Sequence, residues 1–150
     1  MSMGGGGQLE ELQQQIEALE QQKQAIKAEI EAVRAQQEEI DEAIEAVEKL
    51  ETGSTVQVPL GGDAYVRAEI QDIEEVVVEL GGGYAAERDS DGAVDSLETK
   101  RDALDDRIDD LNEEIEEVES ESGKLQEKAQ QVQQQQLQQL QQQMGQERNE

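Results

Sequence analysis

The sequence predicts a mainly α-helical protein, a long antiparallel coiled-coil hairpin with two β-hairpins inserted at its closed end. Two long stretches repeat apolar residues at alternating steps of three and four, which is the heptad pattern of paired helices. Between them lies a stretch of short apolar runs joined by glycines, which is typical of β-hairpins. The chain of 150 residues contains no Phe, Trp, His or Cys. Its buried surface must therefore run along helices rather than form a compact aromatic core.

The first helix is predicted over residues 8–51, which contain neither Pro nor Gly. Residues 1–7 include four consecutive glycines and are expected to form a disordered leader, because glycine is a poor helix former. Lys23 and Gln37 are the polar exceptions in an otherwise apolar seam. The seam occupies positions 9, 12, 16, 19, 23, 26, 30, 33, 37, 40, 44 and 47.

Residues 52–91 are predicted to form the two β-hairpins, the oligomerisation body of the chain. The four predicted strands are Thr55–Leu60, Ala64–Ile70, Glu75–Leu80 and Tyr84–Glu87. Two isolated hairpins are marginal in water, so we expect other subunits to supply strands that complete a barrel. The residues expected at these contacts are Val56, Val58, Leu60, Tyr65, Val66, Ile70, Val76, Val78, Leu80 and Tyr84.

The second helix is predicted over residues 92–143, with the oxygens of Ser90 and Asp91 capping its first turn. Its seam mirrors the first, so that paired positions such as 33 and 108 add up to 141. Such mirrored steps are what an antiparallel helix pair requires, and residues 144–150 are expected to be a disordered tail. The second seam occupies positions 94, 97, 101, 104, 108, 111, 115, 118, 122, 125, 129 and 132.

The end of this helix pair opposite the hairpins carries apolar residues that lack an obvious partner. Beyond Val132 the seam shifts to Leu137, Leu140 and Met144, which would face the glycine-rich leader. One interpretation is a frayed, Gln-rich end without a role. The other is an apolar contact surface. In that case the contact residues are Leu9, Leu12, Val132, Leu137, Leu140 and Met144.

Composition argues against several functions. A net charge of −26 repels nucleic acids and anionic membranes. No apolar run approaches the roughly 20 residues that span a bilayer, and the start of the chain does not resemble a secretory signal, so we expect a cytoplasmic protein. Without His or Cys no common nucleophile–base pair can form, and the acids of residues 102–121 fit a solvated helix face. We therefore expect no enzymatic activity, no metal and no cofactor.

The insert carries the segments VPLGGDAYV (58–66) and VVVELGGGY (76–84). With two hairpins between two coiled-coil helices, it resembles the alpha-type subunits of the archaeal prefoldin family. The resemblance implies a hexamer of two alpha and four beta subunits, with a double β-barrel body and six coiled-coil tentacles. It also implies that unfolded client proteins are held between the tentacle tips without ATP and handed to the group II chaperonin.

Two other hypotheses use fewer of these features. The chain could be an acidic coiled-coil scaffold, or oligomerisation protein, whose tips bind one defined partner. It could also be a nucleic-acid mimic that occupies a basic partner, an interpretation that uses only the charge. Suppression of the aggregation of an unfolded protein distinguishes the chaperone from both.

The spread of acidic residues along the whole chain predicts a dependence on salt. Self-repulsion weakens a compact state at low ionic strength, and at about 1 M salt the screening length falls to about 3 Å. We therefore hypothesise a host with a very salty cytoplasm, such as a halophilic archaeon. Helicity measured by circular dichroism is expected to rise from low to multimolar salt. Equal helicity and assembly across that range would contradict the hypothesis.

Overall fold

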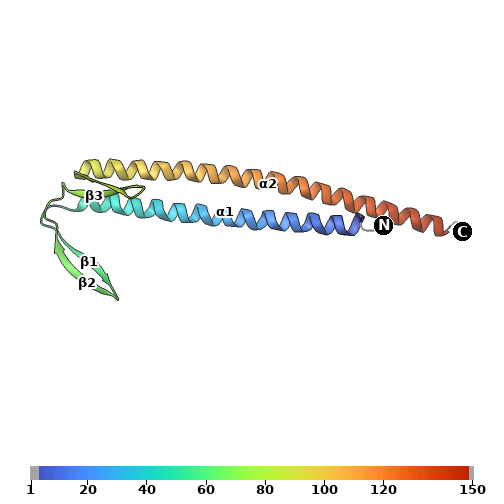
Figure 1. Cartoon of the computed structure of the whole chain (residues 1–150), viewed down its shortest axis with the longest axis horizontal. Helices are drawn as coiled ribbons and strands as arrows, with labels where there is room; N and C mark the ends of the chain where they lie inside the picture. The colour runs from blue at the N-terminus through green and yellow to red at the C-terminus, as the bar shows by residue number, and fades with distance from the viewer. Residues whose placement is uncertain (1–3, 149–150) are drawn as a thin grey trace. The chain divides into compact units, whose positions relative to one another are not determined.

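The protein forms two long helices joined by two β-hairpins, which confirms the predicted fold (Figure 1). The structure is a computed structural model and describes residues 4–148. The four strands lie on either side of the two glycine-dense turns, as predicted. In chain order the elements are α1 (Gly4–Lys49), β1 (Thr55–Gly61), β2 (Ala64–Glu69), β3 (Val76–Gly81), β4 (Tyr84–Arg88) and α2 (Ser90–Arg148).

The chain divides into two compact units, each of which contains part of both helices. The terminal unit consists of residues 1–31 and 109–150, of which 4–31 and 109–148 are described. The hairpin unit consists of residues 32–108 and holds all four strands. Each unit has its own packed seam.

In the terminal unit, burial follows the predicted seam. From Leu9 to Ile30, every seam position is buried or half-buried, and the other positions of α1 are exposed. On α2, Leu111 has no exposed surface. A charged contact lies beside this seam, since Lys23 Nζ is 3.0 Å from Glu119 Oε1. The predicted register places Val118 opposite Lys23, so Glu119 lies one position away, as the register requires.

In the hairpin unit, polar contacts fix the direction in which the helices pair. Gln37 Nε2 donates to Asp105 Oδ1 at 2.6 Å and to the carbonyl oxygen of Arg101 at 3.2 Å. Arg101 Nη1 lies 3.2 Å from Asp41 Oδ1. Moving forward along α1 from Gln37 to Asp41 moves backward along α2 from Asp105 to Arg101, so the helices are antiparallel as predicted. Polar side chains at seam positions commonly specify register in this way.

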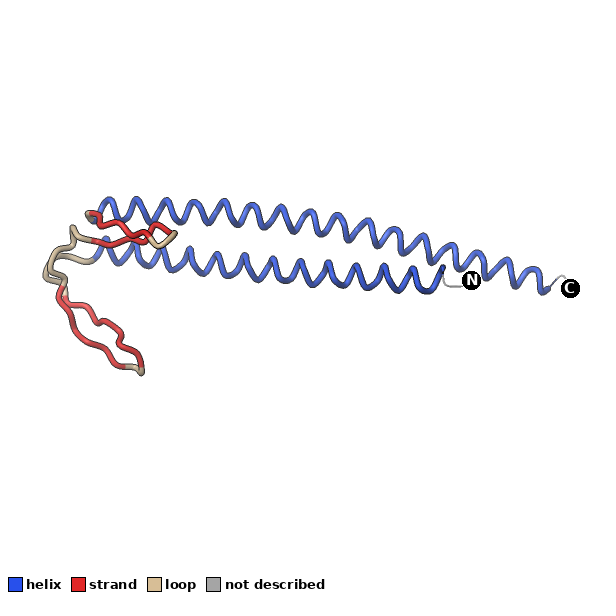
Figure 2. The backbone as a smooth tube through the Cα atoms, viewed as in Figure 1, coloured by secondary structure: helices blue, strands red, loops and turns tan. Residues whose placement is uncertain are grey.

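The two hairpins form separate two-stranded antiparallel sheets (Figure 2). In the first, β1 pairs with β2 so that Val58 lies opposite Val66. In its turn, Gly62 and Asp63 have φ angles of 59° and 61°. Two successive residues with positive φ are what a two-residue turn between twisted strands requires. In the second hairpin β3 pairs with β4, and Gly82 and Gly83 fill the equivalent places with φ of 62° and 82°.

The first turn of α2 is capped by Asp89, not by the predicted Ser90 and Asp91. Asp89 Oδ1 accepts a 2.7 Å hydrogen bond from the backbone N–H of Gly92, and its carbonyl oxygen accepts one from Ala93. A side-chain oxygen just before the helix satisfies an N–H that has no partner within it. Ser90 Oγ instead lies 3.2 Å from Glu74 Oε1, to which it donates. The prediction erred by one residue because three adjacent side chains all had capping chemistry.

Both helices are longer than the predicted ranges. α1 includes Gly4–Gly7, and α2 continues to Arg148, past the predicted end at residue 143. Adding a residue to an existing helix avoids the cost of nucleation. Glycines can therefore extend a helix, although each is roughly 1 kcal/mol less favourable than alanine in a helical conformation. Residues 1–3 and 149–150 of the predicted disordered ends lie outside the described part of the chain.

The Asp89 cap gives a stability prediction. Asp89→Ala is expected to lower the free energy of unfolding by about 1 kcal/mol, because the Gly92 N–H loses its acceptor. Asp89→Asn keeps a side-chain oxygen and is the matched control, with little expected loss. Urea unfolding followed by circular dichroism measures both. Equal losses in the two variants would show that the carboxylate charge, rather than the cap geometry, stabilises this turn.

Candidate functional site

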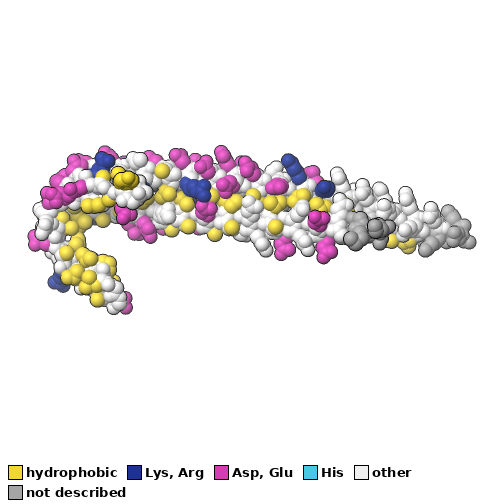
Figure 3. Space-filling model, in the orientation of Figure 1, with side chains coloured by type: hydrophobic (Ala, Val, Ile, Leu, Met, Phe, Trp, Pro, Cys, Tyr) yellow, Lys and Arg dark blue, Asp and Glu magenta, His cyan; other side chains and the backbone are white. Residues whose placement is uncertain are grey.

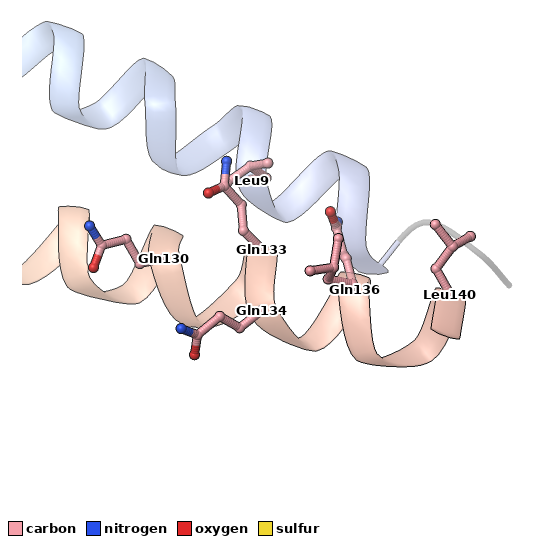
Figure 4. Close-up of a pocket in the computed structure, with 7 residues that line it drawn as sticks. Leu9, Gln130, Gln133, Gln134, Gln136 and Leu140 are labelled. Atoms are coloured by element: carbon pink, nitrogen blue, oxygen red, sulfur yellow. The ribbon is translucent and has the colours of Figure 1, made fainter. Parts of the chain in front are cut away.

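An open groove lies at the end of the terminal unit, where α1 begins. It has a volume of about 680 Å³ and is lined by Leu9 of α1 together with residues of α2. In Figure 4, Gln133 projects from α2 toward Leu9, whereas Gln130 and Gln134 leave the same helix in other directions. The groove is therefore lined by both apolar and amide side chains. The α2 residues that line it are Gln130, Gln133, Gln134, Gln136, Leu137 and Leu140.

Three large apolar side chains near this groove are exposed. Leu137, Leu140 and Met144 expose 61%, 55% and 57% of their surface. In the register that pairs positions adding up to 141, Leu137 lies opposite Gly4, the first residue of α1. Leu140 and Met144 thus have no α1 residue opposite them. Unpartnered apolar side chains at helical spacing form a surface that can bind an apolar partner.

The other residues predicted at this end have different positions. Leu12 and Val132 expose only 5% and 7% of their surface and belong to the core of the helix pair. Leu9 is half-buried and forms one wall of the groove. Leu12 and Val132 could reach a ligand only if the helices separated. The glutamine lining was not predicted, although the run at residues 133–136 was its visible signal.

The groove lies in a segment without charge. Residues 129–146 contain no Asp, Glu, Lys or Arg, and neither do residues 4–9 of α1. Elsewhere acidic side chains cover the helices, and Figure 3 shows this contrast along α2. On a chain of net charge −26, this uncharged end repels a negatively charged polypeptide less than the acidic helix surfaces do.

The first hairpin presents a second apolar surface. Val58 and Val66 lie opposite each other and expose 41% and 46% of their surface, and Leu60 at the strand end exposes 68%. Val56 and Ile70 are half-buried. Figure 3 shows apolar side chains gathered over this hairpin. Tyr65 pairs with Pro59 instead, so it lies on the opposite face and is 60% exposed.

The second hairpin differs from the expectation that both hairpins lack a cover within the chain. Val78 is 5% exposed and Val76 is half-buried, so this face is already covered inside the hairpin unit. The opposite face exposes Val77 at 67%, a residue that the predicted set did not include. Strand alternation shows which residues share a face, but it does not show what covers that face. Leu80 and Tyr84, near the turn, remain exposed.

The titratable groups with shifted pKa values form ion pairs on helix surfaces. A hydrogen bond from Lys23 to Glu119 raises the pKa of Lys23. The Lys49–Glu45 hydrogen bond likewise raises the pKa of Lys49 and lowers that of Glu45. Within residues 4–148 no group of three or more acidic side chains is placed to hold a metal ion. No helix in the same part of the chain is long and apolar enough to cross a membrane.

Comparison with protein families identifies relatives of this chain. The prefoldin subunit family model matches residues 19–143. A prefoldin subunit alpha from Halobacterium salinarum is 69% identical over 107 residues, covering 70% of each chain. One from Halorubrum lacusprofundi is 64% identical over 105 residues, covering 69% of each. One from Haloarcula marismortui is 74% identical over 68 residues, which span 45% of this chain and 44% of that protein.

Among solved structures, a filamentous prefoldin from Methanocaldococcus jannaschii has a similar fold. The TM-score is 0.52 at 24% identity, with 80% of this chain and 96% of that chain covered. At this identity the similarity concerns the fold alone. It agrees with the arrangement of two long helices and two hairpins described above.

Proposed function

The chain belongs to the prefoldin family of chaperone subunits, and we propose that it holds unfolded polypeptides at the uncharged end of its helix pair. The observation that carries this proposal is the exposure of Leu137, Leu140 and Met144 beside the groove. In the proposed mechanism no ATP is used, and the held chain passes to a group II chaperonin. Such a role places the protein in the cytoplasm, where new chains are made.

The small size of the apolar surface sets the strength of each grip. Burying apolar surface contributes about 25 cal/mol per Å², so a few partly exposed side chains bind an unfolded chain only weakly. Several such ends that contact one polypeptide raise the overall affinity through effective concentration. Because each grip is weak, release requires no nucleotide hydrolysis. The acidic helix surfaces disfavour adhesion elsewhere and keep binding at the ends.

The first hairpin supports the proposed assembly. Its exposed valines, Val58 and Val66, need cover that a two-stranded sheet cannot supply for itself. We propose that prefoldin beta subunits supply the missing strands in a hexamer of two alpha and four beta chains. The second hairpin would contribute Leu80, Tyr84 and the outward Val77, because Val78 is already covered within this chain.

The first test removes the apolar side chains at the proposed binding end. The triple variant Leu137→Ser, Leu140→Ser, Met144→Ser is expected to lose most of its ability to suppress aggregation of a chemically unfolded protein. All three side chains are more than half exposed, so the fold should be retained. Light scattering of the diluted client measures suppression, and circular dichroism checks helicity.

The control changes the opposite side of the same helix. Gln135→Ser, Gln139→Ser, Gln142→Ser alters three exposed residues that lie away from the apolar side. It should suppress aggregation as well as the unchanged protein does. Full activity of the Leu137, Leu140 and Met144 variant would remove the basis for placing client binding at this end. A change in oligomeric mass in that variant would show instead that the segment serves assembly.

The second test concerns the first hairpin. Val58→Lys with Val66→Lys is expected to abolish assembly with beta subunits, since burying an unpaired ammonium group costs several kcal/mol. Native mass spectrometry or light scattering of the mixed subunits in high salt gives the mass. Thr55→Lys with Gln57→Lys adds the same charge to the opposite face of β1 and should leave the assembly intact. An intact oligomer in the valine variant would refute the shared-barrel proposal.

A further inference from the structure

The distribution of charge divides the chain into two kinds of surface. Residues 129–146 of α2 and residues 4–9 of α1 are uncharged, whereas acids outnumber bases over the rest of the chain. The groove is lined entirely by residues of these two uncharged segments. A positively charged polypeptide is attracted to the acidic surfaces generally. A negatively charged polypeptide is repelled by these acidic surfaces, whereas the side chains that line the groove carry no charge and do not repel it.

The glutamine side chains of the groove can form hydrogen bonds with the backbone of a bound peptide. Each glutamine amide offers two N–H donors and a carbonyl acceptor. Of the four that line the groove, Gln130, Gln133 and Gln134 are exposed and Gln136 is half-buried. An extended polypeptide presents unpaired N–H and C=O groups that such amides can satisfy. Hydrogen bonds of this kind are neutral, so they do not favour either sign of charge in the peptide.

The apolar part of the groove accommodates side chains of the same segment. Leu9 and Leu137 lie on α1 and α2, and Leu140 continues the apolar surface beyond the start of α1. A volume of about 680 Å³ falls in the range of pockets that hold small ligands, so it admits a few side chains rather than a folded surface. A second copy that paired through Leu137, Leu140 and Met144 would bury three apolar side chains on each copy. A stable interface usually involves about 20 to 30 residues a side.

We propose that this groove selects extended apolar segments whose flanking residues are acidic or uncharged, and that it binds them more tightly as salt rises. This inference rests on the proposed function and names the class of client that the site takes. Apolar contacts and amide hydrogen bonds provide the attraction, and salt removes the remaining repulsion from the acidic helices. Segments rich in Lys or Arg bind the acidic surfaces outside the groove, with an affinity that falls as salt rises.

The experiment uses three twelve-residue peptides with the same Leu-Trp-Leu centre, flanked by Glu, Gln or Lys. The full chain contains no Trp, so the emission of the peptide tryptophan reports its burial without interference. Dissociation constants are measured at about 0.5 M and about 3 M salt, which spans the change from partial to nearly complete screening. Aggregation suppression is measured on the same preparations.

The Glu-flanked and Gln-flanked peptides are expected to bind more tightly at the higher salt, with the larger gain for the Glu-flanked peptide. The Lys-flanked peptide is expected to weaken. Gln133→Glu with Gln136→Glu places two charges in the groove. This variant should bind the Glu-flanked peptide about threefold to tenfold more weakly at about 0.5 M salt, because two close charge contacts, each worth about a factor of five in water, are partly screened at that concentration. High salt should restore most of that loss. Gln135→Glu with Gln139→Glu, on the opposite side of α2, should have less effect.

Other results would overturn the inference. If the Glu-flanked peptide fails to bind, or all three peptides weaken with salt, charge rather than apolar contact controls capture. If Gln133→Glu with Gln136→Glu and Gln135→Glu with Gln139→Glu have equal effects, the groove is not the site. Oligomer mass that rises with concentration and blocks peptide binding would assign the groove to a second copy. Aggregation suppression that persists in these cases leaves the proposed function standing, whereas its absence rejects the function itself.

Discussion

The antiparallel register of α1 and α2 determines which apolar side chains are buried and which are left for a partner. With positions adding up to 141 opposite each other, Leu111 faces Ile30 and both are buried in the terminal unit. In the same register, Gly4, the first residue of α1, lies opposite Leu137, so α2 residues beyond Leu137 have no α1 residue opposite them. A shift of one heptad would cover or uncover a different part of α2. The exposed end of this helix is therefore a consequence of how the pair aligns.

Polar residues within the seam limit such shifts. Gln37 hydrogen-bonds to Asp105, Arg101 pairs with Asp41, and Lys23 pairs with Glu119. Each contact lies at the helix surface, where an ion pair contributes little to stability. Their value is in specificity, because a slipped register would leave a polar side chain facing apolar ones without its partner. The raised pKa of Lys23, caused by its hydrogen bond to Glu119, indicates that the charged form is favoured in this arrangement.

The sequence predicted most of what depends on local periodicity. The apolar seam, the helix direction and the strand positions follow from residue spacing and from glycines that reach positive φ, as at Gly62 and Gly82. What depends on tertiary contact could not be predicted in the same way. The burial of Val78 requires knowing that another part of the hairpin unit covers that strand face. The start of α1 at Gly4 depends on the helix that begins with the residues after Gly7, because this helix continues backward through glycines of poor helix propensity.

The candidate groove shows the same limit. Leu137, Leu140 and Met144 could be identified from the sequence because the mirrored seam gave them no partner. Leu12 and Val132 were included with them since spacing alone does not show where packing stops, and both prove to be buried. The glutamines acquire meaning only once the groove places them beside Leu9. The sequence shows only that glutamines are numerous, whereas the structure shows that four of them line the groove, where their amides can form hydrogen bonds with a ligand.

The charge pattern gives this geometry a physical reason. A chain of net charge −26 avoids adhesion along its length because polypeptides of like charge repel it, and high salt weakens that repulsion without creating new attraction. Contact that persists in high salt must therefore come from apolar burial, which excluded salts strengthen, and from neutral hydrogen bonds. The uncharged residues 129–146 offer both. A charged end would bind polypeptides through ion pairs, which high salt screens. An uncharged end is therefore better suited to binding at high salt.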